Sequence, residues 1–346
     1  GNSSMTKMRD YRWDVVRGMS IIAVVLLHTT SAANVAGVVW RQFVNFPVSM
    51  FFFLAGYFCH CEDSFFRFAK KKCRRVLVPF ALFSVVYALP GLMHCTKNGR
   101  LDVVAVASAM LSFPGDWGYF PISLFQCFLL YPLLKKSSVK IRLACSILCY
   151  ALSFAYFAVA VVCFPDTGMT AGMMPHILCT SWLPMFCLGI SLAERKSEFT
   201  SFGRRKAVLL GIGFLTLSVV EGVCYYLCLG SRQLAMTQIK PFSMTFSCIL
   251  AMFFWQEIRS RDLAVKGQVR NNCVVRNICI LGQASFFVYL WHKAVIMLIR
   301  RFSMGIHQEI MFFITPIAVL VASCLAVKLL LLLPGRIRKL LWIIGF

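Results

Sequence analysis

Residues 14–31 read Asp14-Val15-Val16-Arg17-Gly18-Met19-Ser20-Ile21-Ile22-Ala23-Val24-Val25-Leu26-Leu27-His28-Thr29-Thr30-Ser31, a charged start followed by an apolar run with one histidine inside it. On an α-helix, Arg17 and His28 would differ by only about 20° around the axis and by about 16 Å along it. Asp14 would lie within about 40° of the same face. If this helix crosses a bilayer core of about 30 Å, Arg17 lies at one surface and His28 near the middle. An ionisable side chain at that depth costs free energy, which makes it a functional candidate.

The composition indicates an integral membrane protein. The 346 residues are 59% hydrophobic and only 14% charged, whereas a soluble domain carries about 25% charged residues. Apolar runs of membrane-span length alternate with basic clusters along the chain. We therefore predict an all-α, polytopic bundle of about ten transmembrane helices, forming one membrane-embedded domain over residues 5–346. Residues 1–4 precede Met5 and are interpreted as an expression scar.

The predicted spans follow the apolar runs. They are 15–33, 43–61, 76–94, 119–134, 141–164, 176–193, 207–229, 242–256, 278–299 and 310–333. The apolar piece 101–113 is too short to span and is expected to be interfacial or re-entrant. With the N-terminus inside, this arrangement places three quarters of the 36 Lys and Arg residues on the inner side. The positive-inside rule therefore predicts that both termini face the cytoplasm.

The net charge of +23 has a topological explanation. Because the charges lie between apolar runs, they fit basic cytoplasmic loops better than binding to nucleic acid. The 16 cysteines are mostly inside apolar runs, where cysteine behaves as a small hydrophobic residue. Cys59, His60, Cys61 and Cys73 match no standard zinc spacing, so we expect no metal.

Two histidines within predicted spans are the strongest candidates for catalytic residues. Neutral imidazole at His28 could take a proton from a hydroxyl that attacks a carbonyl. His292 lies at a depth close to that of His28, in the ninth predicted span. Lys293 beside it either extends toward the membrane surface or pairs with an anion or developing oxyanion. The alternative for His28 is a hydrogen bond to a neighbouring helix, which polar groups in membrane proteins commonly make.

Other charged and aromatic residues each have two possible roles, one structural and one in ligand binding. Arg74 and Arg75 stand before the third predicted span, where they are either membrane anchors or ligands for phosphate. Trp117, in Asp116-Trp117-Gly118-Tyr119, belongs either to an aromatic belt or to an acceptor site. Glu221 falls within a predicted span, and the sequence suggests no partner for it.

Four pieces of the chain, in this order, resemble the membrane-bound acyltransferases of the acyltransferase-3 type. They are Asp14…Arg17-Gly18 with His28 after ten intervening residues, Phe51-Phe52-Phe53-Leu54-Ala55-Gly56-Tyr57, Arg74-Arg75-Val76-Leu77-Val78-Pro79, and Leu281-Gly282…Ser285-Phe286-Phe287-Val288-Tyr289-Leu290-Trp291-His292. The resemblance extends over nearly the whole chain. Ala55 departs from the family pattern, which usually has serine before that glycine.

The resemblance implies that the bundle takes an acyl group, commonly acetyl, from acyl-CoA on the cytoplasmic side. The acceptor would be a hydroxyl of a glycan or another molecule of the cell envelope. The resemblance also implies that Arg17 and His28 are functional, and that Arg74 and Arg75 belong to the acyl-CoA entrance. Together with the absence of organelle signals, it favours a bacterial inner membrane.

We therefore expect an acyl-CoA-dependent O-acyltransferase whose partners are the donor, the acceptor and the lipid bilayer. The expected catalytic residues are His28, Arg17 and Asp14, and the expected donor-binding residues are Arg74, Arg75 and Lys72. Tyr289, His292, Lys293 or Trp117 would stabilise the oxyanion or contact substrate. A transporter or flippase for an envelope precursor also fits many spans and buried charges, although we find no internal repeat. A membrane sensor that only binds lipid or glycan is a third reading.

Overall fold

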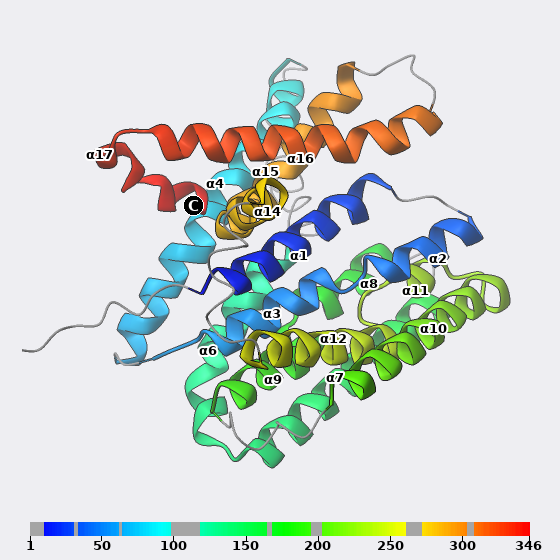
Figure 1. The fold of residues 1–346 in the computed structure, drawn as a ribbon. Coiled ribbons are helices and arrows are strands. Elements are labelled where there is room, and N and C mark those ends of the chain that lie inside the picture. Colours follow the sequence, from blue (N-terminus) through cyan, green and yellow to red (C-terminus); the bar gives the residue numbers. More distant parts are fainter. Residues whose placement is uncertain are drawn as a thin grey trace, which may run out of the picture.

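A computed structural model describes residues 10–30, 34–61, 64–97, 118–164, 168–194, 203–260, 272–302 and 308–346. Within these ranges the chain is helical and contains no strand, which confirms the predicted all-α class. The helices are α1 (Tyr11–Thr29), α2 (Val35–Phe43), α3 (Pro47–Tyr57), α4 (Phe65–Lys97), α6 (Tyr119–Lys136), α7 (Val139–Cys163), α8 (Gly168–Ile177), η2 (Cys179–Ser181), α9 (Leu183–Glu194), α10 (Arg204–Cys228), α11 (Arg232–Met236), α12 (Pro241–Ser260), α14 (Cys273–Gln283), α15 (Ser285–Phe302), α16 (Gln308–Leu332), α17 (Gly335–Arg338) and η4 (Leu341–Ile344). Helices α1 and α3 lie in the middle of the bundle, with α16 on one side and α7 and α10 on the other (Figure 1).

Several helices have the length and composition to cross a membrane. Four stretches qualify within the described ranges, namely Val35–Tyr57, α7, α10 and Ile310–Leu332, and the bent pair α14–α15 would make a fifth. Leu148 and Leu152 on α7 and Leu209 on α10 leave more than half of their surface exposed. Long apolar helices with outward-facing leucines fit contact with lipid, because no described part of the chain covers these side chains.

Three of the predicted spans differ from the structure. The span predicted at 43–61 lies earlier in the structure, at Val35–Tyr57, with a short interruption between the end of α2 at Phe43 and the start of α3 at Pro47, whose ring favours the first turn of a helix. The prediction for 176–193 contains the end of α8, the short η2 and then α9. The prediction for 278–299 is bent by 91° between α14 and α15. Hydropathy cannot detect such breaks, since the residues on both sides remain apolar. The apolar piece 101–113 and residues 1–4 lie outside the described ranges.

Glycines bring two pairs of helices into close contact at the centre of the bundle. A Cβ atom on Gly18 of α1 would lie 2.1 Å from the Ile278 carbonyl oxygen, and one on Gly282 of α14 would lie 1.8 Å from the Asp14 carbonyl oxygen. In the second pair, a Cβ on Gly189 of α9 would lie 2.2 Å from the Phe53 carbonyl oxygen of α3. Small residues allow helix backbones to approach closely in membrane proteins. These contacts fix the position of α1 against α14, and of α3 against α9.

Gly189→Ala should therefore destabilise the protein. The added methyl group would meet the backbone of α3, so the two helices must separate, at a cost of about 1–3 kcal/mol or more. We expect a lower melting temperature by scanning fluorimetry in detergent. The control is Gly213→Ala on α10, where an added Cβ meets nothing within 4 Å, and where the change should be neutral or stabilising. Equal melting temperatures for the two variants would contradict the close contact.

Candidate active site

One helix carries both ends of the candidate site. Asp10 caps α1 by accepting a hydrogen bond from the Arg12 backbone N–H, and α1 then continues without interruption to Thr29. The predicted helical relation between Arg17 and His28 is therefore present, and the two residues lie about 16 Å apart along the axis. The helix therefore places the candidate site at two levels along its axis: the first level is at Arg17 and the second level is at His28.

Asp14 holds Arg17 in place at the first level. Arg17 Nη1 donates a hydrogen bond to Asp14 Oδ1 at 2.9 Å, and Gln283 Nε2 donates to Asp14 Oδ2 at 3.3 Å. The Asp14 side chain is fully buried, and the Arg17 guanidinium also lies 4.8 Å from the centre of the Phe58 ring. Asp14 itself does not line the pocket described next. Asp14 therefore orients the Arg17 side chain and does not face the pocket itself.

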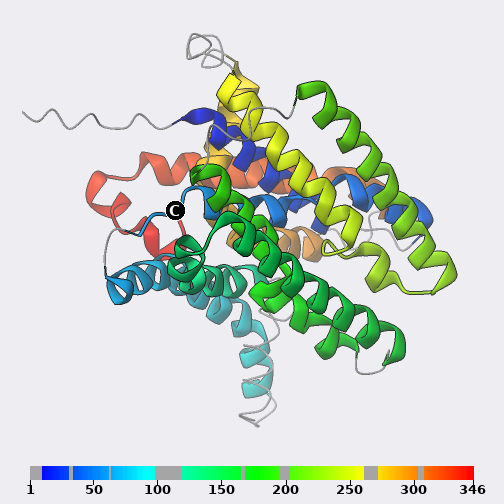
Figure 2. The ribbon, with the colours of Figure 1, turned by 90° about the horizontal axis from the view of Figure 1, so that it is seen from below.

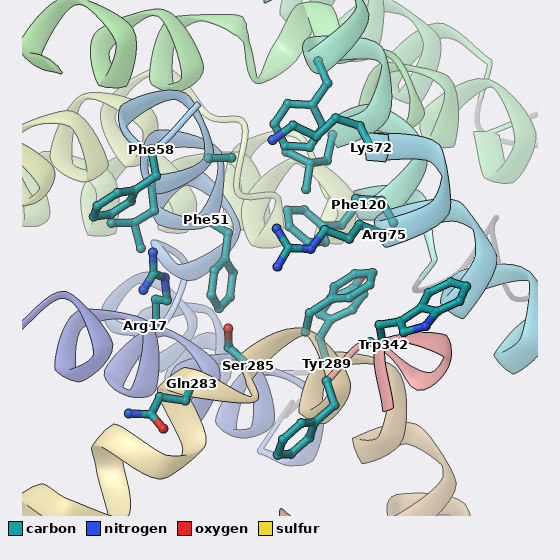
Figure 3. A pocket seen from close by; sticks show the side chains of 18 residues that line it. Arg17, Phe51, Phe58, Lys72, Arg75, Phe120, Gln283, Ser285, Tyr289 and Trp342 are labelled. Atoms are coloured by element: carbon teal, nitrogen blue, oxygen red, sulfur yellow. The ribbon is translucent and has the colours of Figure 1, made fainter. Parts of the chain in front are cut away.

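A pocket of about 410 Å³ opens beside Arg17, between α1, α3, α4, α6 and α15 (Figure 3). Three cationic side chains line it, those of Arg17, Lys72 and Arg75, and the described residues around it include no acid. Its remaining wall is mostly aromatic and aliphatic: Phe51, Leu54, Phe58, Val76, Phe120, Leu124, Phe128, Phe286, Tyr289, Trp342 and Phe346. Positive charge above an apolar wall suits a ligand that has an anionic head and an apolar arm.

The break between α14 and α15 adds to the positive character of the pocket. Helix α15 begins at Ser285, and both Ser285 and Gln283 line the pocket. The first backbone N–H groups of a helix lack partners within it and carry a partial positive charge, so a helix N-terminus favours an anion. A straight helix over 278–299 would have no N-terminus at this place.

Helix α15 connects the pocket to a pair of histidines at the second level. Tyr289 lines the pocket, and its ring centre lies 5.9 Å from that of His292. The His292 ring in turn lies 5.3 Å from the ring of His28. His292 is buried, and its Nδ1 lies 3.2 Å from the Val288 carbonyl oxygen. A row of neighbouring rings, Tyr289, His292 and His28, therefore runs from the wall of the pocket to the half-buried His28 on α1.

The other predicted site residues differ in whether they line the pocket. Arg74 does not line the pocket, and its guanidinium lies 3.9 Å from the centre of the Trp342 ring. Lys293 points to α4, where its Nζ lies 5.8 Å from the centre of the Tyr87 ring. Lys72 does line the pocket, with its Nζ 4.1 Å from the centre of the Phe128 ring. Trp117 lies outside the described residues.

Arg41 is a candidate that sequence reasoning missed. Its Nη1 donates to the Leu27 carbonyl oxygen at 3.0 Å, and its Nε donates to Asn45 Oδ1 at 3.1 Å. Arg41 thus holds the end of α1 directly before His28. A single arginine at the edge of an expected span carries no signal beyond topology, so only the packing of α2 on α1 reveals this role.

Glu221, for which the sequence suggested no partner, accepts hydrogen bonds from the Tyr225 hydroxyl and the Phe242 backbone N–H, both at 3.3 Å. These contacts give it a structural position between α10 and α12. Within the described residues, no group of three or more His, Cys, Asp or Glu side chains is placed to hold a metal ion.

The fold and this site together define a helical membrane protein with a cationic pocket whose wall residue Tyr289 lies beside a histidine pair. A family model described as an acyltransferase domain, of the acyltransferase-3 type, matches residues 10–333, and the chain belongs to this family. The predicted family is thereby confirmed. No curated protein and no solved structure matches the chain.

Proposed function

We propose that this protein is a membrane O-acyltransferase that moves an acetyl group from cytoplasmic acetyl-CoA to a hydroxyl of a glycan or another cell-envelope acceptor. The observation that carries the proposal is the pocket with three cations, whose wall residue Tyr289 is joined to His28 by ring contacts through His292. Membership of the acyltransferase-3 family supports acyl transfer as the reaction. In this proposal the chain crosses a bacterial inner membrane about ten times, with both termini inside.

The pocket suits the donor at its anionic end. Coenzyme A carries phosphates, and Arg75, Lys72 and Arg17 would hold them together with the N-terminus of α15. The apolar wall would then receive the uncharged arm that ends in the thioester. That arm would have to pass Tyr289 to bring its carbonyl carbon to His28, about 16 Å along α1 from Arg17.

The proposed reaction needs one base and one leaving group. His28 would take the proton from the acceptor hydroxyl while the hydroxyl oxygen attacks the thioester carbonyl. The resulting oxyanion would accept a hydrogen bond from Tyr289 or His292, since His292 lies beside His28 and Tyr289 lies beside His292. When the carbon–sulfur bond breaks, the thiolate of CoA leaves and takes up the proton that His28 had removed. Asp14 would act through Arg17, because it contacts Arg17 rather than the pocket.

The test is release of free thiol from acetyl-CoA by the purified protein in detergent, with a pool of sugar acceptors. Release that depends on an acceptor is the expected result. Saturable stabilisation of the protein by acetyl-CoA without release would mean that the acceptor is absent from the pool. Neither release nor stabilisation would overturn the proposal and favour a transporter, which should not bind acetyl-CoA.

A further inference from the structure

The C-terminal segment, residues 334–346, forms part of the pocket although it lies beyond the matched family region, which ends at residue 333. After α16 the chain turns through α17 and η4 and packs against α4. Figures 1 and 2 show this red segment beside the first half of α4. Trp342, Gly345 and Phe346 line the same pocket as Arg75 and Lys72.

Two contacts hold this segment in position. The Arg74 guanidinium lies 3.9 Å from the centre of the Trp342 ring, a cation–π contact between α4 and η4. The Phe346 ring lies 6.3 Å from that of Phe287 on α15. Gly345 has a φ of +85°, and a Cβ there would lie 2.9 Å from the Phe286 ring, so the turn needs glycine. The segment therefore packs closely against α4 and α15.

Figure 3 shows Trp342 and Arg75 at the same side of the pocket. An indole next to cations that suit phosphates is the combination that nucleotides select, because their bases stack on aromatic rings while their phosphates pair with cations. Arg74, predicted to bind phosphate, contacts Trp342 instead, whereas its neighbour Arg75 lines the pocket. The two adjacent arginines therefore differ in their contacts: Arg74 packs on the indole, and Arg75 lines the pocket.

We infer that Trp342 is a donor-binding residue that stacks on the adenine base of the acyl-CoA, with Arg74 holding the indole in place. This inference rests on the proposed function and adds a nucleotide subsite built by the segment that follows the family region. It predicts that the nucleotide end of the donor contacts Trp342 while the phosphates contact Arg75 and Lys72.

The experiment compares two donors, acetyl-CoA and S-acetyl-pantetheine, which lacks the nucleotide. Trp342→Ala should raise the KM for acetyl-CoA about tenfold with little change in kcat, because a base stacked on an aromatic ring is lost. The same variant should leave the KM for S-acetyl-pantetheine unchanged, and Trp342→Phe should retain most of the affinity. The control is Leu340→Ala in the same segment, since Leu340 is 58% exposed and does not line the pocket.

A binding measurement separates this inference from the proposed function. Adenosine 3′,5′-bisphosphate, the nucleotide end alone, should raise the melting temperature of the wild type but not of Trp342→Ala. Equal stabilisation of both would overturn the inference while leaving the proposed function intact. An equal rise in KM for both donors would also overturn it, because Trp342 would then act on the arm. A wild type that binds neither acetyl-CoA nor the bisphosphate would overturn both proposals.

Discussion

His28→Ala is expected to lower the rate of acyl transfer by about 10²- to 10⁴-fold, the usual contribution of a positioned general base. The physical reason is that no other described imidazole occupies its place: His292 lies beside it, but on α15 and with Nδ1 directed to the Val288 carbonyl oxygen. The loss should appear in kcat, while the KM for acetyl-CoA changes little, because His28 does not line the pocket. Steady-state thiol release at several donor concentrations measures both.

The fold should survive this change. His28 is near the end of α1, where Arg41 still holds the Leu27 carbonyl oxygen in the variant. A matched control is Thr29→Ala on the same turn, whose hydroxyl donates to backbone carbonyl oxygens of α1, that of Val25 at 2.7 Å and that of Leu26 at 3.5 Å. This control should keep near-normal activity. Wild-type activity in a folded His28→Ala protein would remove the histidine from the mechanism.

Arg17→Ala is expected to have the second largest effect, on both donor binding and stability. Loss of a charge-assisted contact costs about 1.5–3 kcal/mol, so the KM for acetyl-CoA should rise about 10- to 100-fold. The variant also removes the cation 2.9 Å from Asp14, whose side chain is fully buried. A buried charge without its ionic partner costs about 3–5 kcal/mol. Donor titrations and thermal melts in detergent measure the two effects separately.

The double variant Asp14→Asn/Arg17→Ala separates the structural from the functional contribution of Arg17. Because the asparagine carries no charge, the double variant should recover much of the stability that Arg17→Ala loses. Its KM for acetyl-CoA should nevertheless remain raised, since the pocket still lacks a cation. If the double variant recovered normal donor affinity along with stability, Arg17 would have only a structural role.

Local regularities made much of this site predictable. The apolar run after Arg17 predicts a helix, and the helical repeat places Asp14, Arg17 and His28 toward one face. The composition predicted an all-helical membrane protein, and four pieces of sequence in order identified the acyltransferase-3 family. All of these depend on neighbours in the sequence, which is why they can be read without coordinates.

Long-range packing decided the rest. The 91° break before Ser285 places a helix N-terminus at the pocket, close to Gly282, which packs against the backbone of Asp14, more than 260 residues away in the sequence. The residues on both sides of the break are apolar, so the hydropathy of the sequence does not mark it. That Arg74 contacts an indole while Arg75 lines the pocket likewise depends on where Trp342 lies. The sequence by itself determined the family, the all-helical class and the relation of Arg17 to His28 along one helix. Only the tertiary structure decided which cations share a pocket, because that depends on contacts between segments that the chain order leaves far apart.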